Sequence, residues 1–279
     1  MGMLSERLLE DMKLRRYSAK TIDSYMRNVR GLAGFYPQRS PLKLDENDIR
    51  KYMLHLGERQ LSSATQHQVL GAIRFFYRVT LNKPELVERI PYQRVRSRIP
   101  IILTREEVEH LLGCITSIMY RTICTVIYDM GLRISEACSL KVGDIDSQRM
   151  LIRVRGKGDK ERLVNLGDRT LLLLREYWKV AKPQGPYLFP GEKPGRCIGP
   201  EGVRDALVMA ARDAGIRKLV TPHLLRHCFA THMIELGADL AEIQILLGHS
   251  YIGTTARYTH LSTRHLQTIK TPLDTPPVK

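Results

Sequence analysis

The sequence has no long apolar run and only five cysteines. These two shortages argue against a membrane protein and against a secreted, disulfide-rich protein. No segment approaches the length of a membrane-spanning helix, and the N-terminal residues lack the apolar stretch of a signal peptide. The cysteines are odd in number and none stands in a CxxC pair, so neither a disulfide framework nor a zinc site is indicated. We therefore expect a cytoplasmic protein whose cysteines act as small apolar residues.

Motifs for nucleotide or metal chemistry are also missing. The glycine-rich tip at Gly156 and Gly158 is not a phosphate-binding loop, because no GxxxxGK[ST] is present. His223 and His227 lie four residues apart, yet no HExxH pattern or acidic third ligand accompanies them. We therefore expect neither a metal nor a cofactor, and we expect His227 and the nearby His232 to be structural.

Positive charge is what the sequence has in excess. The net charge is +15 and the pI is about 9.8, which favours a polyanionic partner such as nucleic acid. Residues 1–99 contain 19 Lys and Arg against 10 Asp and Glu, so the N-terminal part has the higher charge density. Charge alone leaves open a basic surface that serves only solubility.

The N-terminal part has the apolar spacing of four amphipathic helices. The first covers about 4–14, and the others follow the cap residues Ser18, Asp45 and Ser62. Short amphipathic helices joined by polar turns predict a compact helical bundle. The basic residues on its polar faces are Arg15, Arg16, Lys20, Arg27, Arg30, Arg74 and Arg78. Each is either a solvated surface residue or a contact to a phosphate backbone.

An extended, basic linker is predicted over residues 90–102. Prolines stand near both of its ends, and proline and the residue before it disfavour helix. Arg94, Arg96 and Arg98 would lie along this linker, where they could contact phosphates.

The C-terminal part is predicted to be mostly helical. Thr104 and Glu107 form a capping box before a first helix, and an apolar helix over about 119–130 ends at Gly131. Alternating residues over 150–155 and 161–166 predict an antiparallel hairpin. Further helices are predicted over 134–140, 169–181, 200–214, 222–236 and 239–247, with a short one that contains Tyr258. The fold class is therefore mainly α, with an N-terminal four-helix bundle and a mixed α+β domain that has a small antiparallel sheet.

Five residues suited to phosphate chemistry stand in distinctive segments. The segments read GLRISE, TPHLLRH, LLGHS and TTARYTH, and they supply Arg133, His223, Arg226, His249 and Tyr258. Two guanidiniums, two imidazoles and a phenol, without a carboxylate pair, suit a reaction that places negative charge on a phosphate. A guanidinium offers a planar fork to phosphate oxygens and stays charged at any working pH.

This pattern closely resembles the catalytic signature of the tyrosine recombinases, the family of the phage integrases and the Xer-type recombinases. The likeness runs from about Leu4 to Leu261. It implies an N-terminal DNA-binding domain over 1–89 and a catalytic domain over 103–270 after the linker. The proline-rich composition of 271–279 separately predicts a disordered tail. The resemblance also implies a homotetramer on two paired sites of double-stranded DNA, which exchanges strands through a 3′-phosphotyrosyl link without ATP or a metal.

The resemblance gives the arginines and histidines their roles. Arg133 and Arg226 would clamp the scissile phosphate, on whose oxygens charge grows in the transition state. His223 and His249 would donate hydrogen bonds to that phosphate or move the proton of the nucleophile. Glu136, three residues after Arg133 on a predicted helix, is either the residue that orients this arginine or a surface glutamate.

Tyr258 is the predicted nucleophile, because it lies nine residues beyond His249, where the nucleophile of the family falls. Tyr251, only two residues beyond His249, is the alternative. The resemblance also implies that Lys157, at the tip of the hairpin, would protonate the departing 5′-oxygen. Lys160 is close enough to be confused with it, but the flanking glycines favour Lys157.

Two other functions remain open at this point. One is a topoisomerase of type IB, which relaxes DNA as a monomer by the same chemistry. The other is a DNA-binding regulator that keeps the fold without catalysis. The separate helical N-terminal part favours recombination over the first, and the complete set of predicted catalytic residues argues against the second.

Overall fold

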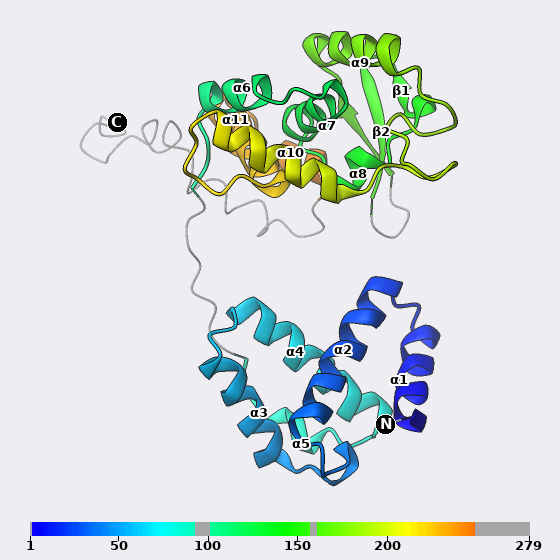
Figure 1. Ribbon diagram of the computed structural model, residues 1–279, viewed down its shortest axis with the longest axis vertical. Helices are drawn as coiled ribbons and strands as arrows, with labels where there is room; N and C mark the ends of the chain where they lie inside the picture. The colour runs from blue at the N-terminus through cyan, green and yellow to red at the C-terminus, as the bar shows by residue number, and fades with distance from the viewer. Residues whose placement is uncertain (1, 93–100, 157–160, 249–279) are drawn as a thin grey trace, which may run out of the picture. The chain divides into compact units, whose positions relative to one another are not determined.

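The computed structural model describes residues 2–92, 101–156 and 161–248, which belong to two compact units divided after Arg98 (Figure 1). The predicted fold class is confirmed, since the first unit is helical and the second combines helices with one small antiparallel sheet. None of the described helices is long and apolar enough to cross a membrane.

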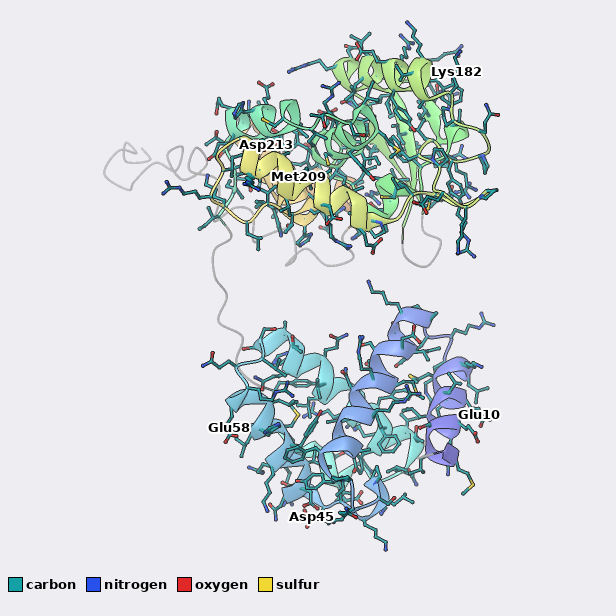
Figure 2. The ribbon with its side chains drawn as sticks, in the orientation of Figure 1. Glu10, Asp45, Glu58, Lys182, Met209 and Asp213 are labelled. Atoms are coloured by element: carbon teal, nitrogen blue, oxygen red, sulfur yellow. The ribbon has the colours of Figure 1, made fainter. Side chains whose placement is uncertain are left out.

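The first unit is built on four helices, and the last three of them begin at local caps. The four are α1 (Gly2–Leu14), α2 (Ala19–Phe35), α3 (Glu46–Glu58) and α4 (Ser63–Phe75). The predicted caps are confirmed: Ser18, Asp45 and Ser62 each accept a hydrogen bond from the backbone N–H three residues ahead. Asp45 and Glu58 mark the two ends of α3 in Figure 2.

Three features of this unit were not predicted, and the first is the short 3-10 helix η1 (Pro41–Lys43). The last turns of α4 continue as a π-helical segment over 76–80, and a short α5 (Glu85–Glu88) follows. The π-helical segment places Phe76 and Tyr77 in the core, where the Tyr77 hydroxyl donates to the Pro41 carbonyl at 2.8 Å. The core of the unit is formed around Leu8, Met12, Leu32, Ile49, Leu70 and Ile73.

The second unit surrounds one apolar helix. Its described elements are α6 (Arg105–Gly113), α7 (Ile118–Asp129), α8 (Ile134–Cys138), the 3-10 helix η3 (Val142–Asp144), β1 (Ile145–Asp146), β2 (Leu151–Arg155), β3 (Glu161–Asn165), α9 (Asp168–Ala181), α10 (Pro200–Asp213), α11 (Pro222–Glu235) and α12 (Leu240–Leu247). Helix α7 packs against α9, α10 and α11 (Figure 1). Met209 and Asp213, labelled in Figure 2, lie on α10, where Met209 is exposed.

The predicted hairpin is confirmed for its two strands, which pair antiparallel with Ile152 opposite Val164. Strand β1 was not predicted, because two residues are too short to show an alternating pattern; it pairs with β2 and completes the order β1-β2-β3. Helix α8 ends at Cys138, two residues before its predicted end. The predicted short helix around Tyr258 and the tail over 271–279 lie outside the described residues.

A buried histidine joins the start of the second unit to α11. The Nε2 of His232 donates to the Leu103 carbonyl at 3.0 Å, so its Nδ1 accepts the hydroxyl proton of Tyr128, at 2.8 Å. Burial lowers the pKa of His232 below the ordinary 6.5, because water no longer stabilises its charged form.

The stability of the protein should therefore fall in mild acid. Unfolded His232 binds a proton near pH 6.5, whereas folded His232 binds it only at lower pH, so its stabilising contribution is present above about pH 6.5 and is lost as the pH falls below it. Urea unfolding between about pH 8 and about pH 5.5 measures this loss. In His232→Gln the loss should be smaller, and parallel pH curves for both proteins would contradict the explanation.

Candidate active site

Arg133 is placed by a tight turn after α7. Gly131 has a left-handed backbone with φ of +62°, and a Cβ at this position would collide with the Phe229 ring and the Leu247 side chain. Only glycine fits this turn. The chain then reaches Arg133, which caps the N-terminus of α8 with an extended backbone and leaves 41% of its side chain exposed. Arg133 is thus anchored at its backbone while its side chain stays partly exposed.

Glu136 lies at the centre of the arginine cluster. Its carboxylate is buried and accepts four hydrogen bonds. Arg133 donates two, from its backbone N–H at 2.9 Å and from Nη1 at 2.7 Å. Arg162 donates the other two, from Nη1 at 3.0 Å and Nη2 at 2.8 Å. Of the two interpretations of Glu136 that the sequence left open, the described contacts are those of an orienting residue and not of a surface glutamate.

The carboxylate of Glu136 is ionised under ordinary conditions. Burial would raise its pKa, but the hydrogen bonds from Arg162 and Arg133 outweigh that cost and hold the pKa below its usual value. Arg226 adds a third positive charge, with Nη1 at 3.8 Å from Glu136 Oε2. One negative charge is therefore shared by three guanidiniums.

Arg226 is buried, with only 2% of its side chain exposed. Its Nη1 donates to the Gly131 carbonyl and its Nη2 to the Leu247 carbonyl, both at 2.6 Å. These bonds tie α11 to the turn before Arg133 and to the end of α12. The described contacts of Arg226 are structural, because both are hydrogen bonds to buried backbone carbonyls. Its predicted role as a phosphate clamp stays a prediction.

The three arginines also share the C-terminal end of α12. The carbonyls of its last turn have no partners within the helix and carry partial negative charge. They accept in sequence from the three guanidiniums: Leu246 from Arg162 at 2.7 Å, Leu247 from Arg226 at 2.6 Å, and Gly248 from Arg133 at 3.4 Å. The cluster therefore fixes the point at which the chain continues towards His249.

Arg162 is the residue of this cluster that the sequence interpretation missed. A signal was available: strand β3 alternates between the two faces of the sheet, and Arg162 falls on the same face as the buried Val164. A charged residue on an inward face requires a partner. In the structure only 11% of its side chain is exposed, and Glu136 is that partner.

His223 lies in the first turn of α11 and is exposed. Thr221 caps this helix by accepting the Leu224 N–H at 3.1 Å, and the His223 ring lies 4.2 Å from the ring of His227, centroid to centroid. The N-terminus of a helix favours an anion. His223 is therefore accessible at the end of α11 from which Arg226 projects one turn later.

The remaining predicted site residues lie outside the described part of the chain and stay predictions: Lys157, His249, Tyr258, the alternatives Tyr251 and Lys160, and the linker residues Arg94, Arg96 and Arg98. Among the described residues, no group of three or more His, Cys, Asp or Glu could hold a metal ion.

The basic residues of the first unit differ in their surroundings. Five are exposed on α2 and on the connection that precedes it: Arg15, Arg16, Lys20, Arg27 and Arg30. Arg74 instead donates to the Ile90 carbonyl at 2.6 Å and lies over the Tyr92 ring, and Arg78 pairs with Glu88 at 3.6 Å. Arg74 therefore binds the segment around Ile90 and Tyr92 within its own unit.

Comparison with known proteins covers both parts of the chain. The sequence matches the phage integrase family over residues 102–265 and the N-terminal SAM-like domain of phage integrases over residues 4–85. An integrase/recombinase of Sinorhizobium fredii is 41% identical over 277 residues, which cover 98% of this chain and 89% of the relative. The tyrosine recombinase XerD of Caulobacter vibrioides is 35% identical, with 94% and 93% covered.

A solved structure shares the fold. The XerH site-specific recombinase, bound to a palindromic difH substrate in a post-cleavage complex, superposes with a TM-score of 0.75 at 23% identity, covering 92% of this chain and 81% of that chain. Family matches over both units and identity to nearly full-length relatives define a recombinase of the integrase type. The chain belongs to the phage integrase family, the tyrosine recombinases.

Proposed function

We propose that this recombinase cleaves one strand of double-stranded DNA with Tyr258 as nucleophile, and that Arg133 and Arg226 clamp the scissile phosphate. The observation that supports this most directly is the anchoring of Arg133, whose backbone and Nη1 are fixed by Glu136 while its side chain stays 41% exposed. A donor held in place before the reaction stabilises developing charge without reorganisation.

Arg133, Arg226 and the two histidines would act together on one phosphate. Arg133 donates to a non-bridging oxygen. Arg226 supplies fixed positive charge from its buried position and also joins α11 to the end of α12. His223, exposed in the first turn of α11, donates a further hydrogen bond or accepts the proton of the nucleophile. His249 does the same from the segment after Gly248.

The chemistry proposed is a transesterification. The phenol oxygen of Tyr258 loses its proton and attacks phosphorus, a bond forms between them, and the bond to the 5′-oxygen breaks. Lys157 donates a proton to that oxygen, which leaves a 5′-hydroxyl and a 3′-phosphotyrosyl link. A 5′-hydroxyl of the partner duplex then reverses the step. The link keeps the energy of the phosphodiester, so the cycle uses neither ATP nor a metal.

We also propose that the two units have different functions. Residues 1–89 bind DNA, 90–102 cross its backbone as a linker, and 103–270 carry the catalytic residues, with the tail over 271–279 outside the site. The exposed arginines and lysine of α2 and of the connection that precedes it support DNA binding by the first unit. Four copies on two paired sites would complete the assembly, and we place it in the cytoplasm.

Trapping of the covalent intermediate tests this proposal. A binding site is first selected from a random duplex pool with Tyr258→Phe, since phosphate contacts supply most of the affinity and this variant should still bind DNA in a salt-sensitive way. A duplex nicked beside the cleavage position should then accumulate a covalent complex with the wild type, visible on a denaturing gel. Tyr258→Phe should form none.

Tyr251→Phe is the matched control and should trap as the wild type does. Trapping by Tyr258→Phe but not by Tyr251→Phe would move the nucleophile to Tyr251. Binding without any covalent complex in the wild type would favour the catalytically inactive regulator. Relaxation of supercoiled DNA by a monomer, without strand exchange, would favour the topoisomerase.

A further inference from the structure

Arg162 connects three elements of the second unit through a single side chain. It belongs to β3, its Nη1 and Nη2 form a bidentate pair with Glu136 at 3.0 and 2.8 Å, and its Nε donates to the Leu246 carbonyl at 2.7 Å. The side chain also lies against the backbone of Gly248, since a Cβ there would be 3.3 Å from Arg162 Cδ. All three of its nitrogens therefore have partners.

We infer that Arg162 is a positioning residue for the recombination reaction: it fixes the Glu136 carboxylate that orients Arg133, and it fixes the end of α12 that leads to His249. The inference rests on the proposed function. Arg162 does not bind the phosphate itself in this arrangement, because its nitrogens are engaged and only 11% of its side chain is exposed. It acts through Arg133 and through the last turn of α12.

The geometry requires a guanidinium at this position. A carboxylate and a carbonyl from two different elements accept from the same side chain, and only arginine offers donors in a planar fork with a third donor at Nε. A lysine ammonium would keep the positive charge but not both sets of bonds. Arg162→Lys therefore keeps the charge and removes part of the positioning. The same substitution in an exposed ion pair should have no effect on cleavage.

The test compares the rate of covalent-complex formation with DNA affinity in Arg162→Lys. We expect the single-turnover cleavage rate to fall by about ten- to a hundredfold, because misplacement of reacting groups by an ångström has effects of this size, while the dissociation constant for the selected DNA changes by less than about twofold. Arg169→Lys is the matched control, since Arg169 forms an exposed ion pair with Glu109. This variant should cleave as the wild type does.

A substrate with sulfur in place of the 5′-bridging oxygen identifies the group through which Arg162 acts. A thiolate leaves without being protonated, so this substrate should restore cleavage by Lys157→Ala. It should leave the defect of Arg162→Lys in place, because Arg133 and α12 are still misplaced. Full restoration would show that Arg162 acts only through the lysine hairpin and would overturn the inference.

Thermal unfolding shows whether the variants fold, and Arg162→Gln serves as a second variant if Arg162→Lys does not. Cleavage at the wild-type rate by a folded variant, or an equal loss of DNA binding and cleavage, would contradict the inference. If neither variant folds, Arg162 is a stability residue and the inference is wrong. A wild type that forms no covalent complex would instead contradict the proposed function.

Discussion

Arg226→Ala should destabilise the second unit by about 3–5 kcal/mol and lower the cleavage rate by more than about a hundredfold. The stability loss follows from burial. The guanidinium has 2% exposure, and its removal leaves the carbonyls of Gly131 and Leu247 without their donor. Each unsatisfied buried carbonyl costs about 1–3 kcal/mol, and the Glu136 carboxylate also loses a neighbouring positive charge.

Arg226→Lys distinguishes charge from geometry. A single ammonium cannot donate to both carbonyls with the geometry that Nη1 and Nη2 provide. Compared with Arg226→Ala, this variant should therefore recover part of the stability but little of the cleavage rate. Urea unfolding measures the first quantity and single-turnover cleavage the second.

Arg169→Ala provides the control for both variants of Arg226. Its side chain is 90% exposed, so removal should change the free energy of unfolding by less than about 0.5 kcal/mol. An Arg226→Ala protein that unfolds at the same urea concentration as the wild type would show that the buried bonds contribute nothing to stability.

Most of the described helices could be predicted from sequence because their signals are local. Ser18, Asp45 and Thr104 each cap a helix with a side chain that reaches only three residues along the chain, and such a contact can be recognised in the sequence. The end of α7 at Gly131 was predictable for the same reason, since glycine is the residue that adopts the left-handed turn.

The arginine cluster could be predicted only in part. The roles of Arg133 and Arg226 came from the likeness to a family, and their spacing said nothing of the partners that hold them. The bond between Arg162 and Glu136 spans 26 positions, and that between Arg133 and Gly248 spans 115. Contacts of this kind depend on how β3, α8 and α12 meet, which no local pattern in the sequence specifies.

Glu136→Gln should destabilise the protein almost as much as Glu136→Ala, by about 3–5 kcal/mol near neutral pH. The amide is nearly the same size as the carboxylate, but it has lost the charge that three guanidiniums share. Its NH₂ group would also face a donor of Arg133 or Arg162 where an acceptor is required. The cleavage rate should fall as well, because Arg133 loses the contact that orients it.

Glu109→Gln is the matched control for this substitution. Glu109 pairs with Arg169 at 3.0 Å, but its side chain is 62% exposed, so we expect almost no change in stability. A Glu136→Gln protein as stable as the wild type would mean that the buried carboxylate holds nothing together, and the cluster would then have to be explained without it.

The destabilisation by Glu136→Gln should also depend on pH, with a sign that follows from the ion pairs. The pKa of Glu136 in the folded protein lies below its unfolded value of 4.5, so the carboxylate stabilises the fold above that pH and its contribution is lost as the pH falls through the folded pKa. The difference in unfolding free energy between the wild type and Glu136→Gln should be largest near neutral pH and should shrink in acid. A difference that stayed constant into acid would point to the shape of the side chain, and not its charge, as what the three arginines require.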